Sequence, residues 1–431
     1  MSTGFERDPD EFARGARAIV VYPDLGGSSR DAEARLEETA GLAAAIGVQV
    51  VERVALRIRA PKPGTLIGSG QVDALAETVR DQELQLAVFD AALTPVQQRN
   101  LEENLKCKVI DRTGLILEIF GERARTAEGR LQVELAHLDY QAGRLVRSWT
   151  HLERQRGGFG FLGGPGETQI EADRRLIRDR MARLRRELDQ VSRTRTLHRD
   201  RRQRAPWPVI ALVGYTNAGK STLFNRLTGA DVMAENLLFA TLDPTLRQIS
   251  LPGIDKAILS DTVGFVSELP TQLVAAFKAT LEEVVSADLL IHVRDIAHPD
   301  SEAQKDDVEQ VLAEIGVSEA TARFEAWNKV DLLDAERREQ VLEDAARHED
   351  VMPISAVTGD GIEALVHAVA AKLTAGHRRY TIHLDPADGA GAAWLHQHGE
   401  VVEQGLDGDR AVYEVRMAPR DYERFAMRNG S

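Results

Sequence analysis

Residues 209–225 read V-I-A-L-V-G-Y-T-N-A-G-K-S-T-L-F-N. The apolar run at 209–213 predicts a buried strand, and the spacing G-x-x-x-x-G-K-S predicts a phosphate-binding loop that opens a helix near Lys220. Gly214 and Gly219 let the backbone approach a phosphate, consecutive N–H groups point toward it, and the helix N-terminus adds partial positive charge. An ordinary strand–turn–helix corner is the alternative, but both flanks carry the pattern that a phosphate loop requires.

The side chains of this loop have expected roles. We expect Lys220 to reach the β- and γ-phosphates and Ser221 to bind Mg²⁺. The other residues expected to contact the nucleotide are Gly214, Tyr215, Thr216, Asn217, Ala218, Gly219 and Thr222.

Two further motifs downstream concern the γ-phosphate. F-A-T-L-D-P-T places Phe239 and Thr241 in a loop, where the Thr241 hydroxyl can join Mg²⁺ once a γ-phosphate is present. The strand A-I-L-S ends in D-T-V-G-F, so Asp261 is expected to hold Mg²⁺ through water and the Gly264 N–H to touch the γ-phosphate. Lys220, Thr241 and Gly264 are therefore the expected catalytic residues, and Ser221, Thr241 and Asp261 the expected metal ligands.

The last motifs concern the base. In N-K-V-D, Asp331 can accept two hydrogen bonds from guanine N1–H and N2–H₂, a pattern that adenine lacks, while Asn328 and Lys329 support the ring. A backbone N–H at Ser355-Ala356 can meet guanine O6. Each motif follows a predicted strand, at the sheet edge where α/β proteins bind ligands, and the set predicts a GTP site.

Length and composition set limits on the whole chain. Its 431 residues predict three or four domains, and 43% hydrophobic with 28% charged residues is typical of a globular protein. One cysteine, Cys107, fits a reducing compartment, and no window approaches the ~18 continuous apolar residues of a membrane span. We expect a cytoplasmic protein without stable membrane insertion.

The segment 17–112 alternates strand-like and helix-like stretches, which predicts a small parallel α/β domain. Its glycine string G-T-L-I-G-S-G, from Gly64 to Gly70, precedes a helix and could hold a second phosphate, although no Lys follows it.

Apolar residues then recur at spacings of three and four from Leu117 to Leu152, and again from Ile177 to Val191. They predict a long helix of roughly 50 Å and a second helix, zipped into an antiparallel hairpin. The intervening segment 153–167 carries glycines with cations and rings, namely Arg154, Arg156, Phe159 and Phe161. It is either a plain turn or a tip that binds phosphates and unstacked bases.

Charge is distributed unevenly. The net charge is −14, yet from Arg174 to Arg204 thirteen Arg and four acids give +9, which leaves −23 for the rest. Such a run is either a solvated helix face or a nucleic-acid surface.

These patterns predict an α/β multidomain chain. We expect an N-terminal parallel α/β domain at 1–112, a long antiparallel helical hairpin at 113–204 with a glycine-rich tip, a P-loop GTPase domain of the Ras-like type at 205–377, and a small C-terminal α+β domain at 378–431.

The G-domain motifs, with I-D-R-T-G-L-I-L-E-I-F and G-G-P-G-E-T-Q-I-E-A-D-R-R, closely resemble those of HflX-type GTPases over nearly the whole chain. The resemblance implies a protein that binds the large ribosomal subunit and its rRNA, hydrolyses GTP to GDP, and splits or rescues stalled ribosomes. We expect it to be a monomer. It also implies ATP use by the N-terminal domain, but Gln71 stands where a Lys is usual. In some related GTPases an Asn at the position of Asn217 helps hold K⁺, whereas a loop hydrogen bond is the alternative here.

Two departures and two rival functions complete the expectations. Phe265 stands where many signalling GTPases carry a water-orienting Gln, so we expect slow hydrolysis that a partner stimulates. Val357 stands where a Lys commonly follows Ser-Ala.

Besides ribosome splitting, the sequence allows a ribosome-assembly or tRNA/rRNA-processing GTPase, or a membrane-linked regulatory GTPase that acts through a protein partner.

Overall fold

The structure, a computed structural model, describes residues 15–26, 30–124, 126–155, 174–191, 207–230, 238–239, 245–267, 281 and 283–429. The chain forms two compact units. Unit 1 comprises Met1–Val191, Glu235–Asp243 and Ser267–Phe277, and unit 2 comprises Ser192–Ala234, Pro244–Val266 and Lys278–Ser431. No helix in the described ranges is long and apolar enough to cross a membrane.

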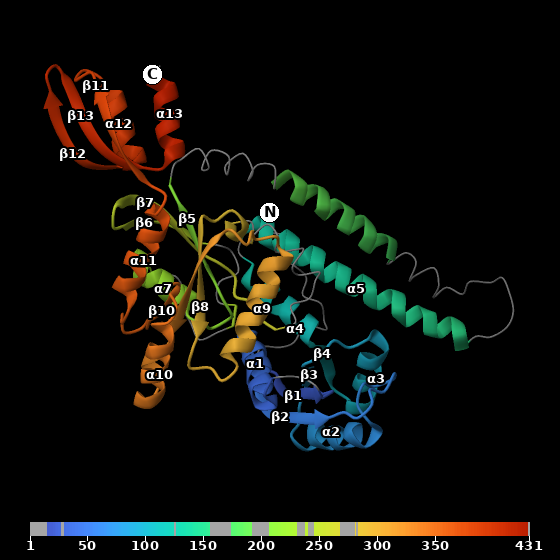
Figure 1. The fold of residues 1–431 in the computed structure, drawn as a ribbon. Helices are drawn as coiled ribbons and strands as arrows, with labels where there is room; N and C mark the ends of the chain where they lie inside the picture. The colour runs from blue at the N-terminus through green and yellow to red at the C-terminus, as the bar shows by residue number, and fades with distance from the viewer. Residues whose placement is uncertain are drawn as a thin grey trace. The chain divides into compact units, whose positions relative to one another are not determined.

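Unit 1 contains a four-stranded parallel sheet of order β2-β1-β3-β4, which confirms the predicted parallel α/β fold (Figure 1). Six of the eight residues of β1 are buried because helices cover both faces of this sheet. In chain order its elements are β1 (Arg17–Asp24), α1 (Ala32–Ala45), β2 (Gln49–Arg57), α2 (Ser69–Asp81), β3 (Leu86–Phe89), α3 (Pro95–Leu105) and β4 (Lys108–Asp111).

The predicted long helix is in fact two helices, α4 (Arg112–Arg123) and α5 (Ala127–Gln155). At Ala124 the backbone turns to an extended conformation, and the Thr126 hydroxyl accepts the Gly129 N–H at 2.9 Å. A threonine at this position satisfies a free N–H of a new first turn, so one helix ends and another begins. The periodicity of apolar residues did not reveal the break because it continues across both helices.

The predicted antiparallel pairing of helices is confirmed within unit 1. The helix at 174–191 runs back along α5 (Figure 1), and a bridge of 2.6 Å joins Arg180 to Glu134 of α5. Met181 and Leu184 are buried, as are Val133 and Ala136 of α5. At ~1.5 Å per residue, the 29 residues of α5 span about 43 Å. Of the predicted tip at 153–167, residues 156–167 lie outside the described residues.

The D-R-T-G sequence at 111–114 attaches α5 to the sheet. Asp111, which is 2% exposed, accepts the Gly114 N–H at 2.8 Å, the Tyr140 hydroxyl at 2.6 Å and Nη2 of Arg144 at 2.8 Å. A Cβ at Gly114 would lie 2.8 Å from the Tyr140 hydroxyl oxygen, so only glycine fits there. Burial and the neighbouring carboxylate of Asp111 raise the pKa of Tyr140, which remains a hydrogen-bond donor.

The neighbouring Arg112 belongs to a second buried network in unit 1. Its Nη1 donates to Asp90 Oδ1 at 2.6 Å, and its Nη2 donates to the Ser267 hydroxyl at 2.7 Å and carbonyl at 3.1 Å. Arg35 donates to the other oxygen of Asp90 at 2.8 Å and to the Ser267 hydroxyl at 3.1 Å. Two buried guanidinium groups thus share one buried carboxylate and hold Ser267 in unit 1.

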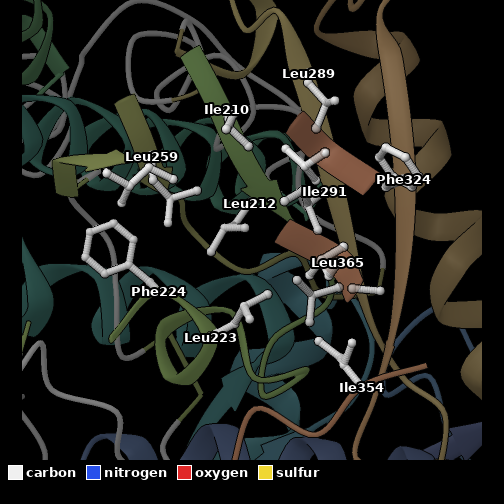
Figure 2. Packing of buried hydrophobic residues seen from close by; sticks show 14 of the residues in the cluster. Ile210, Leu212, Leu223, Phe224, Leu259, Leu289, Ile291, Phe324, Ile354 and Leu365 are labelled. Carbon is white, nitrogen blue, oxygen red and sulfur yellow. The ribbon is translucent and has the colours of Figure 1, made fainter. Parts of the chain in front are cut away.

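Unit 2 contains a six-stranded sheet of order β10-β9-β8-β5-β7-β6, in which only β6 runs antiparallel to its neighbour. Its core joins strand residues such as Leu212 and Ile291 to Phe224 and Leu365 from helices (Figure 2). In chain order the elements are β5 (Val209–Val213), α7 (Lys220–Thr228), β6 (Thr245–Leu251), β7 (Ile254–Asp261), β8 (Leu289–Asp295), α9 (Ser301–Glu314), β9 (Ala322–Asn328), η1 (Val330–Leu332), α10 (Ala335–Ala345), β10 (Val351–Pro353) and α11 (Ile362–Thr374).

The C-terminal part of unit 2 is the expected small α+β domain. Its antiparallel sheet has the order β11-β13-β12, and its own core includes Leu395, Val415 and Phe425. The elements are β11 (Arg378–Leu384), α12 (Gly389–His398), β12 (Glu400–Asp407), β13 (Arg410–Met417) and α13 (Pro419–Asn429).

Candidate functional site

The loop between β5 and α7 has the backbone that the phosphate-loop prediction requires. Gly214 has φ +149°, and a Cβ there would lie 2.2 Å from the Val293 carbonyl oxygen. Gly219 has φ +98°, and a Cβ would lie 2.2 Å from Nδ2 of Asn328. Both positions therefore require glycine by conformation and by space. The loop turns directly into the N-terminus of α7 at Lys220, where backbone N–H groups favour an anion.

Lys220 lies inside this loop. Its Nζ donates to the carbonyl oxygens of Gly214 at 3.0 Å and Tyr215 at 2.7 Å. Burial lowers the pKa of Lys220 to about 8, an effect that Asp261 opposes and Lys329 adds to. A phosphate group in the loop would supply the negative charge that a buried ammonium needs.

The D-T-V-G-F segment pairs with the phosphate loop. The Thr216 N–H donates to the Phe265 carbonyl at 2.7 Å, and the Phe265 N–H donates to the Gly214 carbonyl at 3.2 Å. A Cβ at Gly264 would lie 2.7 Å from Thr216 Cγ2 and 3.1 Å from Nζ of Lys220. The backbone of Gly264 thus lies against Lys220, as a γ-phosphate contact requires. The Phe265 side chain is buried.

Two of the three expected metal ligands lie together. Ser221 Oγ donates to Asp261 Oδ2 at 2.8 Å, at the junction of the loop and α7, and Asp261 is fully buried. A hydroxyl and a carboxylate are hard oxygen ligands of the kind that Mg²⁺ prefers beside phosphates. This pair therefore fits Mg²⁺.

The base motifs converge on Asn328. Its Nδ2 donates to the Ala218 carbonyl at 2.7 Å, and its Oδ1 accepts the Ala356 N–H at 2.9 Å. One side chain therefore joins the phosphate loop to the loop after β10, and Ser355 and Ala356 are both buried. Because the Ala356 N–H is bonded to Asn328 in this structure, the role of that N–H toward guanine O6 stays a prediction.

Lys329 and Asp331 follow β9. Lys329 has φ +68°, and its Nζ donates to Asp295 Oδ2 at 2.6 Å. Asp331 lies in the short helix η1 with its side chain exposed, where it is accessible to a ligand. No sequence motif indicated Asp295, although its position at the end of β8, at the same sheet edge, was a usable signal.

The structure does not place every predicted residue at this site. Thr241 lies outside the described residues. Phe239 belongs to unit 1, where its buried ring packs edge-on against Phe120 with centroids 4.7 Å apart. Tyr215, Thr216 and Asn217 lie in the loop itself, and Thr222 lies in the first turn of α7. Their roles toward a nucleotide stay predictions.

At the glycine string of unit 1, Gln71 caps its own helix. Its Oε1 accepts the Gly68 N–H at 3.0 Å, and its Nε2 donates to the Arg57 carbonyl at 3.1 Å. The N–H of the N-cap residue of α2 is thus bonded to a side chain of the same helix.

Family models match the chain in four consecutive segments. They describe a GTP-binding GTPase N-terminal region at 33–121, a GTP-binding GTPase middle region at 123–202, a 50S ribosome-binding GTPase at 209–329 and an HflX C-terminal domain at 340–431.

Curated relatives are similar over nearly their full length. The chain is 50% identical to a GTPase HflX of Magnetococcus marinus, covering 94% of this chain and 93% of the relative. It is 42% identical to the GTPase HflX of Escherichia coli, covering 96% and 97%. A crystal structure of a GTP-binding protein from Sulfolobus solfataricus in complex with GDP matches at 25% identity and a TM-score of 0.46, covering 84% of this chain and 99% of that one.

Proposed function

Because this chain belongs to the HflX family of GTPases, we propose that it binds the large ribosomal subunit with GTP and splits or rescues stalled ribosomes. Hydrolysis of GTP to GDP and phosphate is the chemistry of the family and of the site. Coupling of this hydrolysis to ribosome splitting or rescue is what we propose.

The chain's own residues supply most of the nucleotide chemistry. Lys220 neutralises phosphate charge, and the N–H groups of the loop and of Gly264 hold the phosphate oxygens. Ser221 and Asp261, with Thr241 as a third ligand, would hold Mg²⁺, which neutralises charge between the β- and γ-phosphates. Asp331 selects guanine.

Phe265 supports dependence on a partner. It follows Gly264 directly and is 1% exposed, so its apolar ring contacts protein rather than water. A hydrocarbon side chain cannot orient an attacking water by hydrogen bonding. We propose that the ribosome provides the group that completes catalysis.

The observation that carries the ribosome proposal is the outer face of the helix at 174–191. Met181 and Leu184 are buried, and Arg180 is paired with Glu134 on α5. The same helix carries exposed arginines on its solvent-facing surface, namely Arg175, Arg178, Arg185 and Arg186. A row of guanidinium groups on a fixed helix suits the phosphates of rRNA, because each contact releases a counterion.

Ribosome sedimentation tests this proposal. With a non-hydrolysable GTP analogue, the wild-type chain should bind large subunits and convert assembled ribosomes into subunits. Replacing Arg175, Arg178 and Arg185 by Gln should weaken binding and reduce the slope of log affinity against log salt by about 0.7–0.9 for each arginine that binds a phosphate in the wild type. A control that removes three arginines from unit 2, at Arg337, Arg347 and Arg410, changes net charge equally and should bind normally.

The rival functions give different results in the same experiment. A ribosome-assembly or RNA-processing GTPase would bind free subunits or tRNA without splitting assembled ribosomes. A membrane-linked regulator would show weak RNA binding that salt does not change. Equal ribosome binding by the two triple variants would show that the exposed arginines of the helix at 174–191 do not contact the ribosome.

A further inference from the structure

Arg226, on the helix that follows the phosphate loop, contacts the backbone of the loop after β10. Its Nε donates to the Ala356 carbonyl oxygen at 2.6 Å, and its Nη2 donates to the carbonyl oxygen of Val357. Gly359, at φ +97°, gives the guanidinium room, because a Cβ there would lie 2.9 Å from Nη1 of Arg226. One side chain thus holds two consecutive carbonyl groups, across 130 residues of chain.

The other bonds of this loop close it farther along. The Gly359 N–H donates to the Ser355 carbonyl at 2.8 Å, the Ser355 N–H donates to the Asp360 carbonyl at 2.9 Å, and the Thr358 N–H donates to Ser355 Oγ at 3.0 Å. They fix the turn but leave the carbonyls of residues 356 and 357 to Arg226. Val357 is 68% exposed, and its hydrocarbon side chain adds no hydrogen bond.

Holding these carbonyls also fixes the direction of an amide. In a trans peptide the C=O of one residue and the N–H of the next lie in one plane and point to opposite sides. With the Ala356 carbonyl turned toward Arg226, the Val357 N–H must point away from it. The Ala356 N–H is itself held by Asn328 at 2.9 Å. Arg226 and Asn328 together therefore set both amides of the Ala356–Val357 segment.

We propose that Arg226 is a positioning residue for guanine recognition, which aims the backbone N–H group of Val357 at O6 of the base. The inference rests on the proposed guanine pocket, in which Asp331 binds N1–H and N2–H₂. It gives the helix of the phosphate loop a second task at the opposite end of the nucleotide.

Three diphosphates test this role by competition binding. GDP has O6, N1–H and N2, IDP lacks N2, and 2-aminopurine riboside diphosphate lacks O6 together with the N1–H. Arg226→Met removes the donors and keeps the aliphatic stem. It should weaken GDP binding about tenfold and lower the preference for GDP over the 2-aminopurine nucleotide by the same factor, because only the hydrogen bond to O6 is lost. The preference for GDP over IDP, which reports on Asp331, should not change.

Arg338→Met is a matched control, because Arg338 of α10 contacts the same loop. Arg338 Nη2 pairs with the Asp360 carboxylate at 3.2 Å, so this contact involves a side chain instead of the carbonyls of 356 and 357. The control should keep all three preferences. An equal loss for all three nucleotides in Arg226→Met would make Arg226 a purely structural contact, and unchanged GDP binding would also overturn the proposal.

Two further variants separate the possible failures. Arg226→Lys keeps one donor group, so its GDP affinity should lie between those of the wild type and Arg226→Met. The proposal can therefore be tested even if the Met variant unfolds at a lower temperature. Asp331→Asn is measured beside them with xanthosine diphosphate. If Asp331→Asn changes base preference and neither Arg226 variant does, Arg226 has no positioning role. If Asp331→Asn changes nothing, the guanine pocket itself is wrongly assigned.

Discussion

At the scale of single residues, the candidate site depends on side chains that hold its loops together. Asn328 is the central connection, since it bonds the carbonyl of Ala218 in the phosphate loop and the N–H of Ala356 in the loop after β10. Lys329 is held by Asp295. Asp331 differs from both because its carboxylate is exposed. A side chain that is accessible to a ligand is the one expected to decide which base is bound.

We predict that Asp331→Asn changes base selectivity. An amide offers one acceptor and one donor where the carboxylate offers two acceptors, so guanine loses a charge-assisted hydrogen bond and xanthine gains a complementary partner. GTP affinity should fall about 10- to 100-fold and xanthosine triphosphate should become the better ligand. Competition binding of the two triphosphates measures this ratio. GTP affinity and selectivity equal to those of the wild type would show that Asp331 is not in the pocket.

A second residue-scale prediction concerns Asn217. It has φ +61°, a left-handed conformation that Asn tolerates better than most residues, and it lies three residues before Lys220 in the phosphate loop. A monovalent cation held there would add positive charge at the β–γ bridge during hydrolysis. Ribosome-stimulated turnover should be about tenfold faster in potassium than in sodium at equal ionic strength, and Asn217→Ser should remove the difference. Equal rates in both salts, with Asn217→Ser unaffected, would exclude the cation.

At the scale of elements, the sequence predicted those features that depend on residues close together in the chain. The glycine spacing at 214–219 is required by positive φ and by close backbone approach, so the loop and its helix could be predicted directly. The break between α4 and α5 could not, because it takes a threonine cap and leaves the apolar period intact. Contacts between segments that are distant in the sequence could not be predicted either. Nothing in the sequence near Arg226 indicates a partner 130 residues away, and nothing near Phe239 indicates Phe120.

The strands β8 and β9 and helix α9 enclose a charged network. Arg294, which is 4% exposed, donates to Glu325 at 2.7 Å, and Lys305 pairs with the same carboxylate at 2.5 Å. Trp327 Nε1 donates to it at 3.0 Å. Burial raises the pKa of Glu325, but these three donors outweigh burial and the pKa is lowered. His292, from β8, lies buried within reach of these charges.

We predict that His292 makes unit 2 sensitive to acid. Burial lowers the pKa of His292 to about 3 from 6.5, although Glu325 partly opposes this, and Arg294 and Lys305 lower it further. Below pH 6.5 the unfolded chain binds a proton here that the folded chain does not, so stability falls as pH falls, by about 1.4 kcal/mol per pH unit. From pH 6.5 to 4.5 the loss is about 2–3 kcal/mol. Below 4.5 the loss for Glu325 is added.

The prediction is checked by hydrogen exchange of the β8 and β9 amides at pH 6.5 and 4.5, corrected for intrinsic rates. His292→Gln should remove most of the pH-dependent loss of protection. His383→Gln, at an exposed position on β11, serves as the control and should behave as the wild type. The same acid sensitivity in His292→Gln and wild type would assign it to other groups.

At the scale of the whole molecule, the chain does not keep its sequence motifs within one unit. Gly264 and Phe265 belong to unit 2, and Ser267, two residues later, is held in unit 1 by Arg35 and Arg112. Phe239 also belongs to unit 1. Charge is also distributed unevenly along the chain, since residues 174–204 carry a net charge of +9 in a chain of net charge −14. An acidic protein with one strongly basic segment is expected to approach an RNA partner through that segment.

Our last prediction concerns the segment of the chain between α5 and the helix at 174–191. Phe159 and Phe161 lie in it, among glycines and arginines, outside the described residues. Replacing both by Ala should leave GTP binding unchanged, because the phosphate loop, Asp261 and Asp331 belong to unit 2. Ribosome splitting should weaken by ~1–3 kcal/mol for each base that loses a stacking partner, or about 5- to 150-fold. The double variant is compared with the wild type in GTP-analogue binding and in light-scattering assays of splitting. Full splitting activity in the double variant would reduce the segment to a connector and leave the arginine face of the helix at 174–191 as the ribosome contact.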